Sequence, residues 1–171
     1  MNIRQAVEAD ASALIALRTL LFTETDFLLW EPEEYQPTLE TEINFIKMLT
    51  RSENSNLLLA FNEGDELIGF MAVMGGNANR IRHNADVFLG VQKKHWRQGV
   101  ARQLFEYLFL WVEKCSLMRL ELTTAVSNTA AYALYRSVGF KLECVKKHYV
   151  LIDGKLSDEY QMSYIVPNIR T

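Results

Sequence analysis

The residues with the clearest chemical meaning lie in one stretch, residues 87–105, with the sequence VFLGVQKKHWRQGVARQLF. An apolar run ends there, a short polar connection follows, and Gly99 opens a helical pattern. The first turn of a helix leaves backbone N–H groups free and carries a partial positive charge, so it suits a phosphate. Gly99 and Ala101 leave room for an anion, and Arg97 and Arg102 could add charge-assisted contacts. The spacing indicates a phosphate-binding turn, although an ordinary tight turn explains the same spacing equally well.

The same stretch also limits which phosphate ligand can be expected. It contains neither a Walker A sequence nor G-x-G-x-x-G, so nucleoside triphosphates and dinucleotides lose their main support. Gly90 interrupts the apolar run, and a glycine inside a strand often marks a bulge or a close approach by another backbone or a ligand. A small residue beneath a bulky neighbour is the simpler explanation of Gly90.

A second informative stretch, residues 128–140, has the sequence NTAAYALYRSVGF. Asn128 can cap a helix, and Gly139 can end it in the left-handed conformation. Tyr135 falls on the apolar face of this helix. A tyrosine in that position is ordinarily a core residue with its hydroxyl at the edge of the core.

The composition indicates one ordinary globular domain spanning residues 1–171, with 49% hydrophobic and 23% charged residues. A net charge of −3 gives no strongly basic face, so we expect no nucleic-acid partner. The longest apolar run, residues 67–74, is too short for a bilayer, and charged residues interrupt the start of the chain, so we expect no membrane segment and no secretory signal. Cys115 and Cys144 form neither a disulfide framework nor a metal-binding pattern. We therefore expect a cytoplasmic protein without a metal.

The elements that must position the two stretches follow from periodicity. Asp10 and Thr38 are expected to cap the first two helices. The order is strand, helix, helix, three strands, helix, strand, helix, two strands, which predicts a mixed α/β (α+β) domain. The expected strands are residues 2–7, 56–61, 66–74, 85–91, 119–124, 141–151 and 156–166, and the helices follow Asp10, Thr38, Gln98 and Asn128.

Taken together in this order, the two stretches resemble the signatures of the GNAT superfamily of N-acetyltransferases. The family's signature for the pyrophosphate of acetyl-CoA is Gln or Arg, two residues, Gly, one residue, then Gly or Ala. Residues 99–101 match its second half, whereas Trp96 stands where Gln or Arg is usual and Arg97 lies one place later. This departure would affect one side-chain contact with the pyrophosphate, but it would leave a cradle of backbone amides unchanged. Residues 128–140 resemble the family pattern N-x-x-A-x-x-L-Y-x-x-x-G-F in full, and the resemblance extends over residues 2–165.

The resemblance implies a mostly antiparallel sheet of about seven strands flanked by four helices, with acetyl-CoA as cosubstrate and no metal. Acetyl-CoA would lie in a V-shaped cleft between residues 86–91 and 119–125, where the two strands part at a bulge near Gly90. Backbone groups of Leu89 and Val91 would hold the pantetheine arm and the acetyl carbonyl. The residues expected at the cofactor are Leu89, Gly90, Val91, Arg97, Gln98, Gly99, Val100, Ala101, Arg102, Asn128 and Tyr135.

The resemblance also assigns roles in the reaction. Tyr135 matches the usual general acid, and with an ordinary pKa of about 10 it is protonated at neutral pH and can donate to the departing thiolate. Asp86 stands near the place where some relatives carry a catalytic glutamate, and His83 precedes it, so Asp86 is the candidate base. A solvated position for either residue, with a chain of water molecules taking the proton, is the alternative.

The acceptor site in this family is lined by the region between the first two helices and by the later hairpins. Here that region holds Trp30, Glu31, Glu33, Glu34 and Tyr35, in which carboxylates beside aromatic rings could attract a cationic amine. A solvated acidic loop explains these residues at least as well. A polyamine, an amino acid, an aminoglycoside and a protein N-terminus all remain open as acceptors.

The sequence therefore predicts an acyltransferase that moves an acetyl group from acetyl-CoA to a primary amine of a small molecule, by direct attack in a ternary complex. The alternatives are a non-catalytic acyl-CoA sensor, an acetyltransferase of a protein N-terminus or lysine, and an unrelated α/β domain. Family members are often dimers, which makes a homodimer an open expectation. Tyr160, Met162 and Tyr164 would suit a dimer edge and suit a central strand equally.

Overall fold

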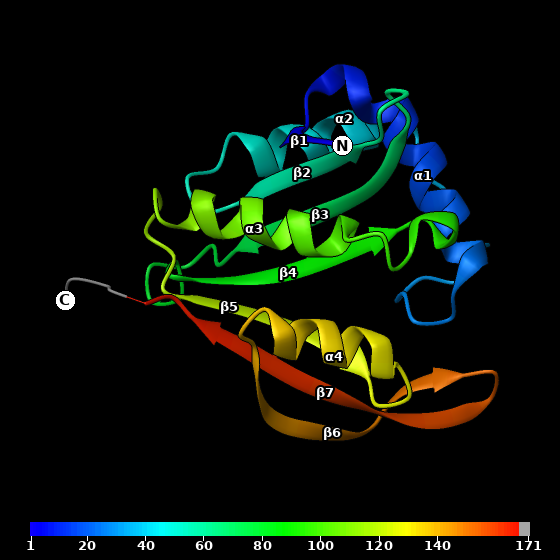
Figure 1. Cartoon of the computed structure of the whole chain (residues 1–171), viewed down its shortest axis with the longest axis vertical. Coiled ribbons are helices and arrows are strands. Elements are labelled where there is room, and N and C mark those ends of the chain that lie inside the picture. The colour runs from blue at the N-terminus through cyan, green and yellow to red at the C-terminus, as the bar shows by residue number, and fades with distance from the viewer. Residues whose placement is uncertain (168–171) are drawn as a thin grey trace.

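The computed structural model describes residues 1–167 and consists of a seven-stranded sheet with helices on both faces (Figure 1). The strands are β1 (Asn2–Gln5), β2 (Asn56–Phe61), β3 (Leu67–Gly75), β4 (Asn84–Val91), β5 (Arg119–Ala125), β6 (Lys141–Ile152) and β7 (Lys155–Ile165). The helices are α1 (Ala11–Glu24), α2 (Leu39–Thr50), α3 (Val100–Val112) and α4 (Thr129–Ser137), with short 3-10 turns at Glu8–Asp10 and Lys93–His95. The element order expected from periodicity is confirmed.

The strands lie in the order β1-β2-β3-β4-β5-β7-β6, and every neighbouring pair is antiparallel except β4 and β5. A parallel pair needs a crossover connection, and α3 supplies it by carrying the chain from the end of β4 to the start of β5. The parallel ladder is short: it joins only residues 84–86 to residues 119–121. This one parallel pair is the point at which the sheet can open.

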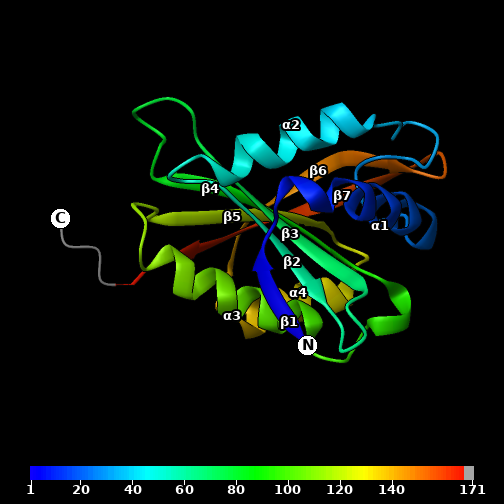
Figure 2. The same cartoon turned by 90° about the horizontal axis from the view of Figure 1, so that it is seen from above.

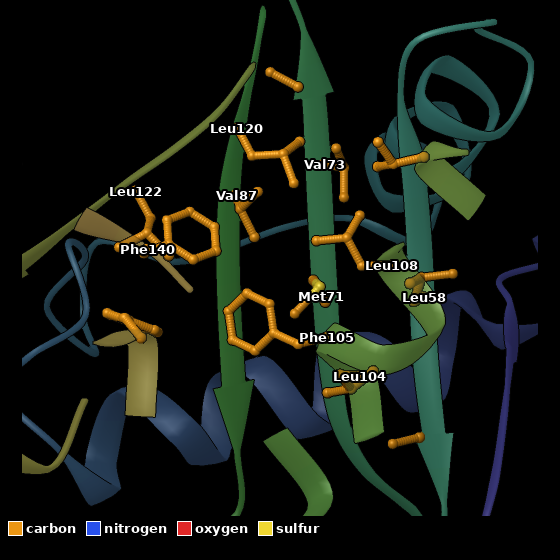
Figure 3. Packing of buried hydrophobic residues seen from close by; sticks show 14 of the residues in the cluster. Leu58, Met71, Val73, Val87, Leu104, Phe105, Leu108, Leu120, Leu122 and Phe140 are labelled. Carbon is orange, nitrogen blue, oxygen red and sulfur yellow. The ribbon is translucent and has the colours of Figure 1, made fainter. Parts of the chain in front are cut away.

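The first four strands lie between two helical layers, as seen from above in Figure 2, and β2 is the most deeply buried of them. All six residues of β2 are buried, because successive side chains point to opposite faces and both faces are covered. Leu57 and Leu59 join the core beneath α1 and α2, and Leu58 joins the core beneath α3. Figure 3 shows the second core, in which Leu104 and Phe105 of α3 pack against side chains of β2, β3, β4 and β5.

The last strands are covered on one face only. Tyr160 and Tyr164 of β7 pack against Tyr132 and Phe109 on the helices, with ring centroids 4.8 and 4.6 Å apart, and Met162 is fully buried. β7 lies between β5 and β6, so its apolar residues belong to a central strand and not to an edge. The opposite face of these strands carries polar side chains, and α1 and α2 contact β2, β3 and β4 instead.

Two of the three expected N-caps are confirmed. The Thr38 hydroxyl and the Asn128 amide oxygen each accept a hydrogen bond from the backbone three residues later. Asp10 is different and corrects the expectation: its own backbone is helical, and its carboxylate accepts from the Val7 N–H at 2.8 Å and from the Arg4 guanidinium. The reason is the 3-10 turn that precedes α1, because this turn makes Val7 the residue whose free amide needs a partner.

None of the helices within residues 1–167 combines the length and the apolar character that crossing a membrane requires.

Candidate active site

β4 and β5 separate immediately after Asp86 and Glu121, the last pair of their ladder. β4 continues to Val91 alongside β3, and β5 continues to Ala125 alongside β7, so the two strands form a V. A cleft of about 1350 Å³ opens at this V. It extends from the start of α3 and α4 to the loop after α1 and to the β6–β7 hairpin.

The backbone of β4 presents free groups to this cleft. The N–H of Gln92 donates to the carbonyl of Ile68 at 3.0 Å, and because N–H and C=O directions alternate along an antiparallel strand, those of Leu89 and Val91 point away from β3. They face the gap left by β5, as the resemblance implied. The Val91 carbonyl is already used, since it accepts from the indole N–H of Trp96 at 2.6 Å. Trp96, the departure from the family signature, thus fastens the connection after β4 to the end of that strand.

Gly90 is not a bulge, which corrects the expectation. The register between β3 and β4 runs without a shift through Gly90. A Cβ on this residue would lie 2.7 Å from Leu21 Cδ1 and 3.0 Å from the Phe70 ring. Gly90 therefore allows α1 to pack closely on the sheet, and the cleft opens because the parallel ladder ends at Asp86, not because β4 bends.

The turn before α3 has the geometry of an anion cradle. Gly99 lies in the left-handed region with φ of 83°, and Arg97 does so with φ of 59°, a rare conformation for a residue with a side chain. No side chain caps α3, so its first N–H groups, at residues 100–102, are free to bind a ligand. A Cβ at Gly99 would meet nothing closer than the Gln103 side chain at 4.0 Å, so the space above the turn is open. These residues fit a pyrophosphate.

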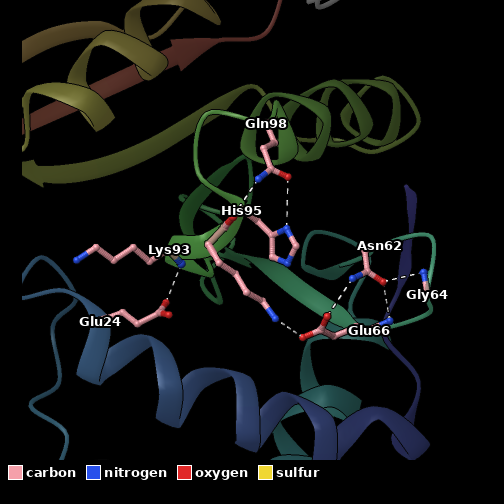
Figure 4. Close-up of polar contacts among 8 residues, drawn as sticks. Glu24, Asn62, Gly64, Glu66, Lys93, His95 and Gln98 are labelled. Carbon is pink, nitrogen blue, oxygen red and sulfur yellow. Dashed lines mark hydrogen bonds and ion pairs between the residues drawn. The ribbon is translucent and has the colours of Figure 1, made fainter.

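Polar contacts from two other elements, and one contact within the connection itself, hold this connection (Figure 4). The Lys93 N–H donates to Glu24 at the end of α1 at 2.8 Å, and Lys94 pairs with Glu66 at the β2–β3 hairpin at 2.6 Å. The side-chain amide of Gln98 donates to the Lys94 carbonyl at 2.9 Å. Gln98 is not among the residues that line the cleft, so its expected role reduces to its backbone N–H. The turn is held in place from outside the site.

Side chains of α3 and α4 complete the cofactor side of the cleft. Arg97 is exposed at the rim, and Arg102 donates to the Ser137 hydroxyl at 2.9 Å, which ties α3 to α4. Asn128 lines the cleft as well as capping α4, and Gly139 ends α4 with φ of 105°, as its place in the sequence predicts. The two sequence stretches thus meet at one end of the cleft.

Tyr135 is held by a cluster of aromatic rings. Its ring is 8% exposed and meets Phe105 edge-on with centroids 5.9 Å apart, while Phe140 lies 6.3 Å away. The residue lines the cleft, and burial raises the pKa of its hydroxyl above the usual value of 10. Tyr135 is therefore rigid and protonated at the wall of the cleft, whereas Tyr132 packs on Tyr160 and is not among the lining residues.

Asp86 stands at the apex of the V, beside Glu121. Its pKa is raised, first by partial burial and then by the Glu121 charge, and Lys146 opposes this rise. Glu121 is itself occupied, because it accepts from the Arg119 guanidinium and from the Gln161 side chain, the latter at 2.9 Å. His83, the other candidate, uses its backbone carbonyl to accept two N–H groups from the start of β5 and does not line the cleft.

The loop between α1 and α2, residues 25–38, forms the far wall. Trp30, Glu31 and Glu34 line the cleft as expected. Tyr35 does not: its ring lies 4.9 Å from Phe22, and its hydroxyl donates to the buried Glu42. Tyr35 therefore joins the loop to α2 and does not contribute to the wall of the cleft.

Sequence reasoning missed several residues of this wall. Phe27 and Leu29 stand beside Trp30 in the loop, and an apolar pair in an acidic loop was the available signal. The others come from strands far away in the sequence, where no local pattern marks them; they include Phe88, Lys146, Tyr149, Leu151, Glu159 and Gln161.

Within residues 1–167, no three His, Cys, Asp or Glu side chains are grouped so that they could hold a metal ion.

Comparison with known proteins agrees with this architecture. The L-amino acid N-acetyltransferase AaaT of Escherichia coli (strain K12) is 28% identical over 143 residues, covering 79% of this chain and 86% of that protein. The [Ribosomal protein bS18]-alanine N-acetyltransferase of the same organism is 30% identical over 102 residues, covering 56% and 69% respectively.

Two solved structures illustrate the likeness in three dimensions. A GNAT-family acetyltransferase from Streptococcus pneumoniae superposes with a TM-score of 0.93 at 30% identity, over 96% of this chain and 99% of the other. The acetyltransferase yncA from Salmonella typhimurium, solved with its cofactor acetyl-CoA, shares the fold with a TM-score of 0.87 at 17% identity, over 100% and 96%.

The family model described as "Acetyltransferase (GNAT) family" matches residues 18–140, a range that includes the V between β4 and β5, the turn before α3 and all of α4. The chain belongs to the GNAT family of acetyltransferases and is an acyltransferase.

Proposed function

We propose that this protein transfers the acetyl group of acetyl-CoA to a primary amine of a small molecule, by direct attack in a ternary complex. The observation that carries the proposal is the single cleft that joins the free amides at the start of α3 to the acidic apex at Asp86 and Glu121. One end suits the cofactor's phosphates and the other suits a cationic amine. A neighbour with the same fold was solved with acetyl-CoA.

Acetyl-CoA supplies the activated acetyl group when it is bound. The N–H groups of residues 100–102 hold its pyrophosphate, and Arg97 adds charge at the rim. The free backbone groups of Leu89 orient the pantetheine arm, and an N–H of β4 stabilises the negative charge that develops on the carbonyl oxygen. Because one cleft holds both substrates, the amine nitrogen and the acetyl carbon are kept close together, which raises the rate of the reaction.

Two side chains move the protons. The new bond joins the amine nitrogen to the acetyl carbon, and the carbon–sulfur bond breaks. Tyr135, which burial keeps protonated, gives its proton to the departing thiolate. Asp86 accepts the proton that the amine loses, directly or through water, and its raised pKa makes it a better base than an ordinary carboxylate.

A protein acceptor is the second candidate, because one relative at 30% identity is named for acetylating an alanine of a ribosomal protein. The other relative is named for acting on L-amino acids. A non-catalytic sensor is less well supported, since a sensor needs no proton donor at the wall of the cleft and Tyr135 stands there.

Calorimetric titration with acetyl-CoA, followed by thiol release with a panel of amines, tests the proposal. We expect binding, and release of free CoA that depends on an amine. Binding without release for any amine or peptide would favour the sensor, and absence of binding would reject the assigned cofactor.

A further inference from the structure

The acceptor end of the cleft has a marked charge imbalance. We define this end by its lining residues: residues 26–32 and Glu34 of the loop, Asp86, Phe88, Glu121, Glu159, Gln161, Lys146 of β6, and residues 149–153 at the end of β6 and in its turn. The basic side chains that line the whole cleft are His95, Arg97, Arg102 and Lys146, and the first three belong to the α3 end. Lys146 is thus the one cation that the described residues place at the acceptor end, where it faces the carboxylates.

Two of those carboxylates have spare capacity for a ligand. Both carboxylate oxygens of Glu121 already accept hydrogen bonds, from Arg119 and Gln161. Glu159 has a buried Oε2 atom without a hydrogen-bond partner among the described residues. Glu159 and Gln161 are two residues apart on β7, so their side chains point to the same face of the sheet. Glu121 lies on that face too, because Gln161 donates a hydrogen bond to it. Asp86 stands beside Glu121 across the ladder, and none of the hydrogen bonds within residues 1–167 involves its carboxylate.

Apolar side chains line the same end of the cleft as these carboxylates and are exposed. Phe88 follows Asp86 on the same face of β4 and is 49% exposed. Trp30 and Leu29 from the loop are 47% and 76% exposed, and Tyr149 from β6 is 57% exposed. Exposed apolar surface gathered inside a cleft gains free energy when an apolar ligand covers it.

Resting on the proposed acetyl transfer, we infer that the acceptor is a small primary amine carried on an aromatic or branched aliphatic body, with no carboxylate beside the amine. The ammonium group is attracted by Asp86 and Glu159, and the body packs against Phe88 and Trp30. A neighbouring carboxylate would face Asp86, Glu121 and Glu159 at close range. Lys146 is a poor partner for such a carboxylate, because its ammonium group already lies over the Tyr149 ring, 4.4 Å from the centroid.

Arg18 does not supply the missing cation. It lies behind the loop, where it pairs with the buried Glu42 at 3.0 Å, and its guanidinium stacks over the Tyr35 ring. It lines a small neighbouring cavity, which shares Trp30 and Glu34 with the cleft, and it is not among the residues that line the cleft itself. Its charge is already neutralised, so the acceptor end keeps its negative character.

The experiment measures kcat/KM of the full-length protein, with saturating acetyl-CoA, for matched amines. Phenethylamine and L-phenylalaninamide carry the apolar body without a carboxylate, L-phenylalanine adds the carboxylate, and spermidine has charge without the body. We expect L-phenylalaninamide to exceed L-phenylalanine by about 10-fold or more, and phenethylamine to exceed spermidine by a similar factor. Phe88→Ala should lower kcat/KM several-fold more for phenethylamine than for spermidine. Leu110→Ala, which truncates an exposed leucine on α3, is the control and should change neither.

Three results would overturn the inference while leaving acetyl transfer intact. L-Phenylalanine could be the best substrate and lose its advantage in Lys146→Met, which would show that Lys146 binds a carboxylate. Spermidine could be best, which would make charge alone decisive. A peptide with an N-terminal alanine could exceed every small amine by 10-fold, which would assign a protein acceptor. If acetyl-CoA binds and no amine or peptide is acetylated, the transferase proposal fails as well.

Discussion

The two ends of the cleft are built in different ways. The cofactor end is made mostly of backbone: the first amides of α3, a left-handed glycine, and the free edge of β4 where its ladder with β5 stops. The acceptor end is made of side chains that come from the loop after α1, from β4 and β5, and from the β6–β7 hairpin. Binding at the cofactor end therefore depends on the conformation of the backbone, whereas binding at the acceptor end depends on the identity of the side chains.

The difference shows how one fold can keep a cofactor and change its acceptor. A backbone cradle tolerates many sequences, provided that Gly99 and the end of the parallel ladder are retained. Side chains on a loop and a hairpin can be replaced without disturbing the cores, because neither element contributes much to them.

The largest effect is expected at the cofactor end. Gly99→Glu should abolish measurable acetyl-CoA binding in calorimetry, because a glutamate is strained at φ of 83° and places negative charge in the pyrophosphate cradle. Gly154→Glu is the matched control, since Gly154 has φ of 71° and open space around it, but lies in the β6–β7 turn. Equal loss in both variants would mean that strain, and not the phosphate site, explains the result.

Tyr135→Phe tests whether the cofactor end also contributes chemistry. We expect kcat to fall by about 10³-fold, within the range typical of general acid catalysis, with acetyl-CoA affinity unchanged. Tyr132→Phe on the same helix should keep full activity, because its ring packs on Tyr160 away from the cleft. A Tyr135→Phe variant with normal kcat would remove the hydroxyl from the mechanism.

Asp86 lies where the two ends meet, and its pKa gives a prediction about pH. Because its pKa is raised, the acidic limb of kcat/KM should lie above the ordinary carboxyl value of about 3.9, with activity rising as Asp86 loses its proton. Asp86→Asn should remove this limb and lower the plateau by about 10²-fold. An unmoved limb would assign the base elsewhere.

The same substitution should change stability in the opposite direction. The folded protein holds the Asp86 proton more tightly than the unfolded chain, so the free energy of unfolding falls as pH rises from the unfolded pKa through the raised folded pKa. Asp86→Asn avoids this loss. Its melting temperature should therefore exceed that of the parent protein at neutral pH, and the difference should disappear below about pH 3.9.

The contrast between the two ends also explains what the sequence could predict. The order of strands and helices follows from local periodicity, and the cofactor end follows from two contiguous stretches whose glycine and cap residues act on their own neighbours. The apex of the cleft depends on where β4 and β5 stop pairing, which is a property of two strands separated by α3. For this reason the sequence suggests a bulge at Gly90, whereas the register between β3 and β4 is unbroken there.

The residues of the acceptor end are harder to predict from the sequence, for a similar reason. Glu159 and Tyr149 reach the cleft only because β6 and β7 fold back beside β5, and their spacing in the sequence carries no sign of this. Tyr35 shows the reverse case. It stands next to the lining residues in sequence, but the buried Glu42 of α2 draws its hydroxyl to the other side of the loop.

The smallest expected effect is that of Tyr35→Phe, which should change binding at the acceptor end alone. Tyr35→Phe removes the hydrogen bond of 3.1 Å to Glu42, which joins the loop to α2 through a group that Arg18 also contacts. We expect the acceptor KM to rise about threefold, since a loss of about 0.5–1.5 kcal/mol from one such bond loosens the position of Trp30. The acetyl-CoA dissociation constant should stay the same, because the start of α3 is held by Glu24 and Glu66 and not by this loop.

Tyr107→Phe, on the exposed side of α3, controls for the loss of a hydroxyl as such and should change neither constant. A rise in both constants for Tyr35→Phe would mean that the loop and the cradle move together. The two ends would then be one mechanical unit, and exchange of acceptors would require changes on both sides of the V. A rise in the acceptor KM alone would show that the loop can be altered while the cofactor cradle keeps its affinity, which is the condition for the two ends to diverge separately.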